Sequence, residues 1–409
     1  MLKHLRQGRL IALSYSLVGL LGSGAAIAQD EFPIADAIQP FCSPVKEYNG
    51  GAQDWQERQF PKSISVEIAK SKQRKWIENL LKTLTSRKKN ISPSARKNFD
   101  ATVSWEINGH RCESKAKVRL NGDAKDHISY KGGTVIASIA VKLLNGHIGN
   151  AVRFKLLLPE TRLGDRELIA IQMFREFGFL APESRIVAGS LNGTEIEYLF
   201  QEMPAKEFME ANSLRESVLV EGDERWGWLM HSRPDVYEER LVHDAVWVEN
   251  RSFGRADNRG WLANPIATDI AISGITLANR LYHAYHVDKP QRIGDEHHLG
   301  MTSSFRLDQN SEIIESERLF VLLSKVLYAS HGLRLHNRKF YFDPMYEMLR
   351  PIYYDGMPLR HRDNLLGIFP RDGTFPKSEI DLVAAKLSDR DVRNRIYRDI
   401  LSRGATISR

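Results

Sequence analysis

Cysteine is almost absent from this chain, and its scarcity excludes one class of site. The sequence holds two cysteines, Cys42 and Cys112, which are too few for a zinc site built from thiolates. In an exported protein two cysteines are able to pair. A disulfide between them would close a loop of about 70 residues and add about 3–4 kcal/mol of stability in the chain-entropy model.

Long apolar runs and a strong excess of one charge are also missing. Beyond the N-terminus no stretch reaches the roughly 18 apolar residues that a membrane-spanning helix needs. The formal net charge is +7 for 409 residues and falls to +4 without the first 28 residues. A balance this mild does not indicate a nucleic-acid partner.

The N-terminus has the order of a secretory signal peptide. Lys3, Arg6 and Arg9 precede an apolar run from Leu10 to Leu21, and small residues follow, ending in Ala26-Ile27-Ala28. This order predicts cleavage after Ala28. We therefore expect an exported protein, periplasmic or secreted, with an uncleaved N-terminal anchor as the alternative.

Basic residues gather in one short region after the N-terminus. An anionic polymer or headgroup is one partner that such a region would bind, and a solvated helix face is the plainer interpretation. The residues are Lys70, Lys72, Arg74, Lys75, Lys82, Arg87, Lys88 and Lys89.

The order of elements predicts an α+β protein. Apolar residues at helical spacing predict helices over 69–86, 165–177, 266–286, 311–330 and 377–402. Alternation and turn residues predict strands at 101–107, 115–120, 134–144, 151–158, 184–190, 195–201, 339–342 and 350–354.

A strand-rich half with one helix, followed by a helical half with a hairpin, is the order of a protein-kinase-like bilobal fold. We expect a strand-rich N-lobe with one key helix and a helical C-lobe. The expected divisions are a signal peptide at 1–28, an extended lead-in with a helix at 29–100, the N-lobe at 101–203, a connecting or inserted region at 204–265, and the C-lobe with a metal-binding hairpin at 266–409.

Two residues of the N-lobe fit phosphoryl transfer. Ile139-Ala140-Val141-Lys142 is similar to the kinase strand whose lysine contacts nucleotide phosphates. Glu167 lies on the inward stripe of the next helix, where it would pair with Lys142. An edge-strand lysine and a first-turn glutamate at a helix dipole are the structural alternatives.

Two residues of the C-lobe fit magnesium, which prefers hard oxygen ligands. Asn337 and Asp355 stand at either end of the expected hairpin, as the metal-binding Asn and Asp do in kinases. A loop Asn and an ordinary Asp-Gly turn are the alternatives.

These motifs resemble the spore-coat protein H (CotH) kinase-like family over roughly residues 105–365. The likeness rests on the segment from Val141 to Arg162, on RELIAIQMFREFG, on the Asn192-Gly193 hairpin, on HGLRLHNRKFYFDP and on PIYYDG. It implies an atypical kinase using ATP and Mg²⁺, with backbone near Glu202 and Met203 meeting adenine. It also makes Lys155 a rival of Lys142 for the phosphate.

One departure concerns the catalytic base. Kinases place an aspartate shortly before the metal-binding asparagine, but no Asp or Glu lies between Leu327 and His336. His331 is the substitute base, since an imidazole near its reference pKa accepts protons. A histidine at a helix C-terminus is the structural alternative.

Two other functions compete with phosphotransfer to a protein or polysaccharide acceptor in the envelope. A metal hydrolase would use His283, His286, His297 and His298 with Asp295 and Glu296, although no familiar ligand spacing is present. A catalytically inactive kinase fold that binds envelope or extracellular polysaccharide would use Trp226, Trp228, Trp247 and Trp261 with Arg251, Arg255 and Arg259.

Overall fold

A computed structural model describes residues 60–87, 90–107, 110–223, 253–288, 311–358 and 375–404. Residues 42–409 form one compact unit, and all of the described residues belong to it. The expected signal peptide, residues 29–59 of the expected lead-in and Cys42 lie outside the described residues. Cys112 is buried and takes part in a disulfide, and Cys42 is the one other cysteine of the sequence.

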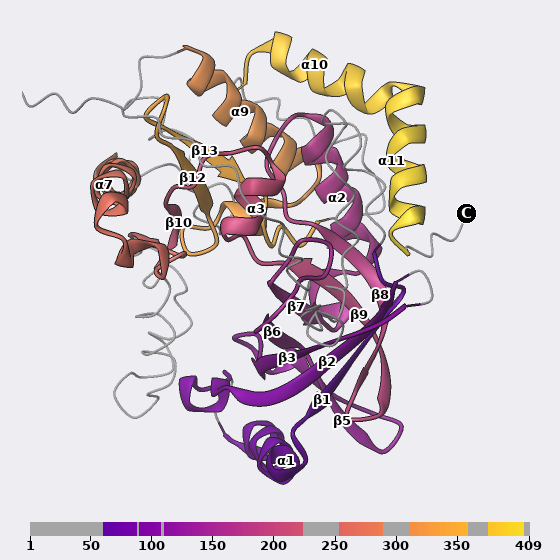
Figure 1. The fold of residues 1–409 in the computed structure, drawn as a ribbon. Helices are drawn as coiled ribbons and strands as arrows, with labels where there is room; N and C mark the ends of the chain where they lie inside the picture. Colours follow the sequence, from indigo (N-terminus) through magenta and orange to yellow (C-terminus); the bar gives the residue numbers. More distant parts are fainter. Residues whose placement is uncertain are drawn as a thin grey trace, which may run out of the picture. The chain divides into compact units, whose positions relative to one another are not determined.

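Seven strands of the first half close into a barrel in the order β1-β2-β3-β6-β7-β9-β8 (Figure 1). Neighbours in the barrel are antiparallel except at the closure, where β1 runs parallel to β8. The strands are β1 (Ser63–Ile68), β2 (Phe99–Ile107), β3 (His110–Leu120), β6 (Ile139–Leu143), β7 (Arg153–Leu157), β8 (Ser184–Leu191) and β9 (Thr194–Glu202).

Alternating side chains explain this barrel. Inward positions such as Val103, Val118 and Phe154 are completely buried, while their neighbours along each strand face outward. The β8–β9 hairpin turns at Asn192 and Gly193, whose φ angles are 49° and 78°. Two consecutive positive φ angles are what a tight hairpin turn needs, and Asn-Gly is the pair that adopts them most readily.

The strand expected over 134–144 is two strands, β5 (Thr134–Ala137) and β6, separated by Ser138. Ser138 is fully buried, its amide donates to the carbonyl of His127, and its hydroxyl accepts from the amide of Leu158. β5 pairs with β4 (Ile128–Lys131) in a separate hairpin. The sequence did not predict this break because the apolar pattern continues across it.

The first two expected helices are confirmed as α1 (Lys70–Thr85) and α2 (Asp165–Glu176). Gly178 has a φ of 81° directly after α2, and the amide of Phe179 returns to the carbonyl of Phe174. This is the usual glycine ending of a helix. The buried face of α2 packs both on α9 (Ser311–Val326) and on α11 (Arg390–Ser402).

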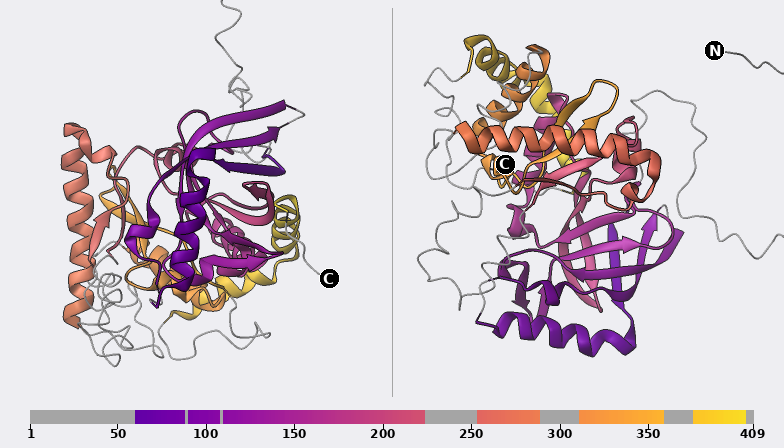
Figure 2. Two further views of the ribbon diagram at one scale, coloured as in Figure 1. Left: turned by 90° about the horizontal axis from the view of Figure 1, so that it is seen from below. Right: turned by 90° about the vertical axis from the view of Figure 1, so that its left-hand side faces the viewer.

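The second half contains more sheet than the sequence predicted. The expected hairpin, β12 (Lys339–Asp343) and β13 (Met348–Ile352), belongs to a four-stranded sheet of order β11-β10-β12-β13. The added strands are β10 (Leu219–Gly222) and β11 (Gly254–Ala256), and α7 (Pro265–Asp288) covers one face of the sheet (Figure 2). A short helix, α3 (Lys206–Ala211), leads from the barrel to β10.

The prediction of a single helix over 377–402 is wrong, because the helix is interrupted. It is two helices, α10 (Lys377–Ser388) and α11, joined at Asp389. The Asp389 backbone is extended, and its carboxylate accepts from the amides of Asp391 and Val392. An aspartate that caps a helix N-terminus in this way starts a new helix.

Within the described ranges, no helix is both long enough and apolar enough to cross a bilayer. This agrees with the absence of long apolar runs beyond the first residues of the sequence.

A carboxylate holds the C-terminal end of α11 against the barrel and gives a pH-dependent prediction. Glu183 pairs with Arg175, Arg185 and Arg403. Burial alone raises the pKa of Glu183, but the three guanidinium groups outweigh it and lower the pKa to about 2.

Because the folded-state pKa lies below the ordinary value, Glu183 stabilises the protein above about pH 4.5, and this contribution is lost as the pH falls toward about 2. We expect Glu183→Gln to lower the free energy of unfolding at neutral pH by about 3 kcal/mol, with a difference from wild type that shrinks in acid. Urea unfolding at several pH values measures this. A difference that stays constant with pH would contradict it.

Candidate functional site

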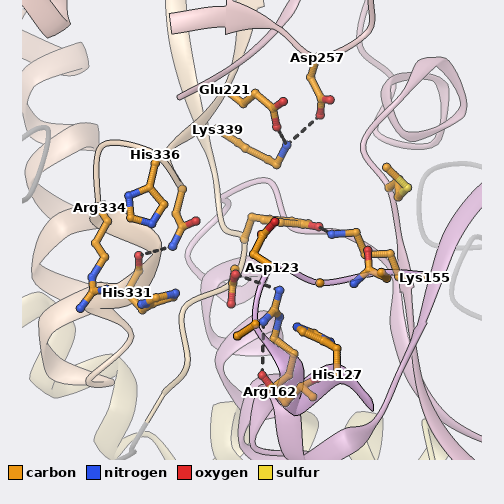
Figure 3. Close-up of a pocket in the computed structure, with 18 of the residues that line it drawn as sticks. Asp123, His127, Lys155, Arg162, Glu221, Asp257, His331, Arg334, His336 and Lys339 are labelled. Atoms are coloured by element: carbon orange, nitrogen blue, oxygen red, sulfur yellow. Dashed lines mark hydrogen bonds and ion pairs between the residues drawn. The ribbon is translucent and has the colours of Figure 1, made fainter. Parts of the chain in front are cut away.

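A pocket of about 630 Å³ lies between the outer face of the barrel and the four-stranded sheet. Figure 3 shows Lys339 with Glu221 and Asp257 on one side, His331 and His336 on a second, and Lys155 on a third. Nine arginines and lysines line the pocket against five carboxylates. This excess favours an anionic ligand. The cations are Arg96, Arg119, Arg153, Lys155, Arg162, Arg255, Arg259, Arg334 and Lys339.

Three of these cations surround a small residue on the barrel. Ala140 is paired in register with Arg119 on one neighbouring strand and with Lys155 on the other. Arg153 lies two residues before Lys155, on the same face of β7. Ala140 itself is buried, and all three cations line the pocket.

None of the three cations forms an ion pair with a carboxylate among the described residues, and Lys155 instead donates to the Tyr354 hydroxyl. Arg96, by contrast, pairs with Asp123. Burial lowers the pKa of Arg119, and repulsion from Arg96 and Arg153 lowers it further. Asp123 attracts Arg119 and Asp257 attracts Arg153 at longer range, so the two charges are partly offset. Because neither guanidinium group is held in a direct ion pair among the described residues, both are able to contact an anionic ligand.

Lys155, the rival of Lys142 in the sequence, points into the pocket. Its ammonium group donates to the Tyr354 hydroxyl and lies 5.0 Å from the ring centroid. Because the hydroxyl lies at the edge of the ring, this contact is a hydrogen bond rather than a cation–π interaction.

Lys142 does not reach this site. Its side chain is exposed on β6, where it is paired in register with Lys117 and Arg153. It shares the outer face with Ala140 but lies two residues further along the strand, and it does not line the pocket. The structure therefore places Lys155, and not Lys142, in this pocket, while the phosphate-contacting role expected of either lysine stays a prediction.

Glu167 is completely buried in the first turn of α2. Its carboxyl group accepts a hydrogen bond of 3.0 Å from the Tyr353 hydroxyl. Burial and the charge of Asp355 raise its pKa to about 8, against the opposing effect of Arg162. Glu167 is therefore largely neutral at pH 7, and the expected ion pair with Lys142 is not formed.

Asp355 is held in a conformation that is uncommon for aspartate. Its φ is 54°, in the left-handed region, and such strain tends to persist where surrounding contacts enforce it. One carboxylate oxygen pairs with Arg162 at 2.9 Å, and the other, Oδ1, is buried without a hydrogen-bond partner. Burial raises the pKa of Asp355, but Arg162 and His331 outweigh this and lower it.

Asn337 lines the same pocket as Asp355. Its amide nitrogen donates to the carbonyl of His331 at 3.1 Å, which leaves the amide oxygen available as an acceptor. The partnerless oxygen of Asp355 and this amide oxygen are hard donors of the kind that magnesium takes. The described residues hold no cluster of three His, Cys, Asp or Glu side chains suited to a metal, so most of the remaining ligands would be phosphate or water oxygens.

Three histidines line the pocket: His331, which is the expected catalytic base, His336 and His127. Burial lowers the pKa of His336 to about 3. Burial and the nearby Arg162 and Lys155 likewise lower the pKa of His127 to about 3. His127 and His336 are therefore neutral at pH 7. The role of His331 as the catalytic base stays a prediction.

Glu202 and Met203 lie where the chain leaves the barrel. Met203 lines the pocket, whereas the Glu202 side chain is buried. The amide of Met203 donates to the carbonyl of Arg153, and that of Glu202 donates to the carbonyl of Glu183. Both amides already have partners, so an adenine ring would meet carbonyl oxygens here and not a free N–H.

Several pocket residues were missed in the sequence. Lys339 pairs with Glu221 and, at 2.8 Å, with Asp257; these carboxylates outweigh burial and raise its pKa. Nothing in the sequence links these three residues, which come from different strands and loops. Arg119 and Arg153 stand at outward positions of their strands. The alternation of apolar and polar residues along these strands was the one signal in the sequence that could have placed them on the outer face.

The competing sites are mostly beyond the described residues. His297, His298, Asp295 and Glu296 lie outside them, as do Trp226, Trp228, Trp247 and Arg251 and the side chain of His286. His283 is exposed, and Trp261 packs partly buried against the core beneath α7. Arg255 and Arg259 line the pocket.

No protein-family model matches the chain, and no curated protein matches it at a significant level.

Proposed function

We propose that this protein binds a magnesium nucleotide in the pocket beside Lys155 and transfers a phosphoryl group to an envelope or secreted acceptor, as a kinase-like enzyme. One observation carries the proposal. Lys155 and two arginines without carboxylate partners face the same pocket as the oxygens of Asp355 and Asn337. Phosphoryl transfer requires cations on the phosphates and hard oxygens for the metal.

Each side chain then has a definite part. Lys155, Arg119 and Arg153 would bind phosphate oxygens, and Asp355 with Asn337 would hold magnesium, which neutralises phosphate charge when bound. Tyr353 links Glu167 to the segment that carries Asp355, and Tyr354 links Lys155 to the same segment. In this proposal the two tyrosine hydrogen bonds would take the place of the Lys–Glu contact of kinases. His331 would accept the proton of the attacking hydroxyl.

Binding of ATP is the direct test. We expect ATP with magnesium to raise the thermal midpoint of the full chain, because a ligand at about a hundred times its Kd adds about 2.7 kcal/mol to the free energy of unfolding. Asp355→Asn should lose the part of this shift that depends on magnesium while keeping a smaller response to ATP alone. Transfer of labelled γ-phosphate to envelope fractions then tests the reaction.

The alternative is an inactive fold that binds acidic polysaccharide. It is favoured by the missing carboxylate before Asn337 and by the cationic lining of the pocket. A thermal midpoint that acidic polysaccharide raises and that ATP with magnesium leaves unchanged would replace the first proposal with this one.

A further inference from the structure

Helix α1 lies on the outside of the barrel, on the side away from α7, α9 and α10 (Figures 1 and 2). Its inner face is anchored by Trp76 and Leu80, both 1% exposed, and the Trp76 ring packs edge-on against Phe99 at 5.2 Å. Asn79 donates to the carbonyl of Ala95. The helix is thus held in place by one face, and the opposite face is presented outward.

The exposed part of α1 combines apolar side chains with an excess of positive charge, a combination that a simple solvated helix does not need. Ile77 is 49% exposed and Leu81 is 45% exposed, and they stand on adjacent turns. Around them the helix carries a single acid, Glu78, which pairs with Arg74. The exposed cations of the helix are Lys70, Lys72, Arg74, Lys75 and Lys82.

We propose that this outward face of α1 docks on an anionic lipid surface. Peripheral membrane binding combines apolar side chains that enter the interface with cations that pair with lipid headgroups. Lysine and arginine stems reach past apolar neighbours while their charges stay in the headgroup layer. The face provides both parts on an element that the barrel already orders.

The apolar pair distinguishes a lipid surface from a soluble polyanion. A polyanion in water would attract the five cations, but it offers no apolar phase for Ile77 and Leu81. An isolated exposed apolar residue is ordinary. Two of them on consecutive turns, on a helix that carries five exposed cations and one acid, match the chemistry of the lipid interface.

Vesicle co-sedimentation of the full chain tests the proposal. We expect binding to vesicles containing phosphatidylglycerol and little binding to pure phosphatidylcholine. The triple variant Lys70→Glu, Lys75→Glu, Lys82→Glu should weaken binding at least about tenfold, because each cation near an anionic surface contributes about a factor of five. Ile77→Ser with Leu81→Ser should also weaken it, by about tenfold.

The matched control reverses three exposed lysines elsewhere: Lys142→Glu, Lys206→Glu and Lys377→Glu. It changes the net charge equally and should retain most of the binding. All variants carry the same N-terminal segment, so differences between them report on α1. Unchanged binding of the α1 charge variant would overturn the proposal. A second result would also overturn it: vesicle binding that is weakened by the charge variant but not by the Ile77 and Leu81 variant, and that soluble polyphosphate inhibits. That result would identify a site for a soluble polyanion.

Discussion

Replacing Lys155 by alanine is expected to weaken the binding of ATP with magnesium by about ten- to a hundredfold. A hydrogen bond between charged groups contributes about 1.5–3 kcal/mol, and every 1.4 kcal/mol is a factor of ten in affinity. Lys155 is half-buried in a pocket where water competes less for the phosphate than at an open surface. Isothermal titration of the purified chain measures the change directly.

The sequence contains a matched control for this experiment. Lys142 lies on the adjacent strand, on the same outer face, and was the first lysine that the motif suggested. Its side chain is exposed and outside the pocket, so Lys142→Ala should leave the affinity unchanged within about twofold. Equal losses in both variants would mean that general charge, and not the pocket, binds the nucleotide. Loss only with Lys142→Ala would restore the kinase motif as first identified.

The second large effect is on stability. Arg162→Met is expected to lower the free energy of unfolding by about 3–5 kcal/mol, because it leaves the buried Asp355 carboxylate without its cation. The Arg162 and Asp355 side chains are only 10% and 12% exposed, and the 2.9 Å pair between them is the main compensation for that burial. Chemical unfolding at neutral pH gives the value.

Two comparisons make this prediction specific. The double variant Arg162→Met, Asp355→Asn removes both charges and should recover a large part of the loss, as expected for a pair whose cost lies in an uncompensated charge. Arg74→Met breaks an ion pair whose members are 91% and 58% exposed, so it should change stability by less than about 1 kcal/mol. A double variant as unstable as the single variant would show that Arg162 acts through packing.

Local chemistry accounts for the parts of the fold that were predicted from the sequence. The helix at 165–177 ends where Gly178 adopts a positive φ, and the 184–202 hairpin turns at an Asn-Gly pair. Both signals act over a few residues and need no distant partner. The break at Ser138 and the start of α11 at Asp389 depend instead on hydrogen bonds. Apolar periodicity does not report such contacts.

The candidate site could be predicted only in part. Asn337, Asp355, His331 and Lys155 were identified and line one pocket, since each stands next to a turn or strand pattern that the sequence shows. The sequence did not show which of Lys142 and Lys155 faces the pocket, because both lysines stand at outward positions of neighbouring strands. Which of them faces the pocket depends on the register of β6 against β7 and on Tyr354.

The sequence alone determined where most strands, turns and helices lie, because alternation, helical spacing and turn residues are properties of short segments. Only the tertiary structure decided that seven strands close into a barrel, that Glu167 is buried and largely neutral at pH 7, and that Arg119 and Arg153 line one pocket with Lys155. Burial and charge pairing are set by residues far apart in the chain. Their electrostatic energies depend on distance and on solvent exclusion, and the order of residues along the chain specifies neither.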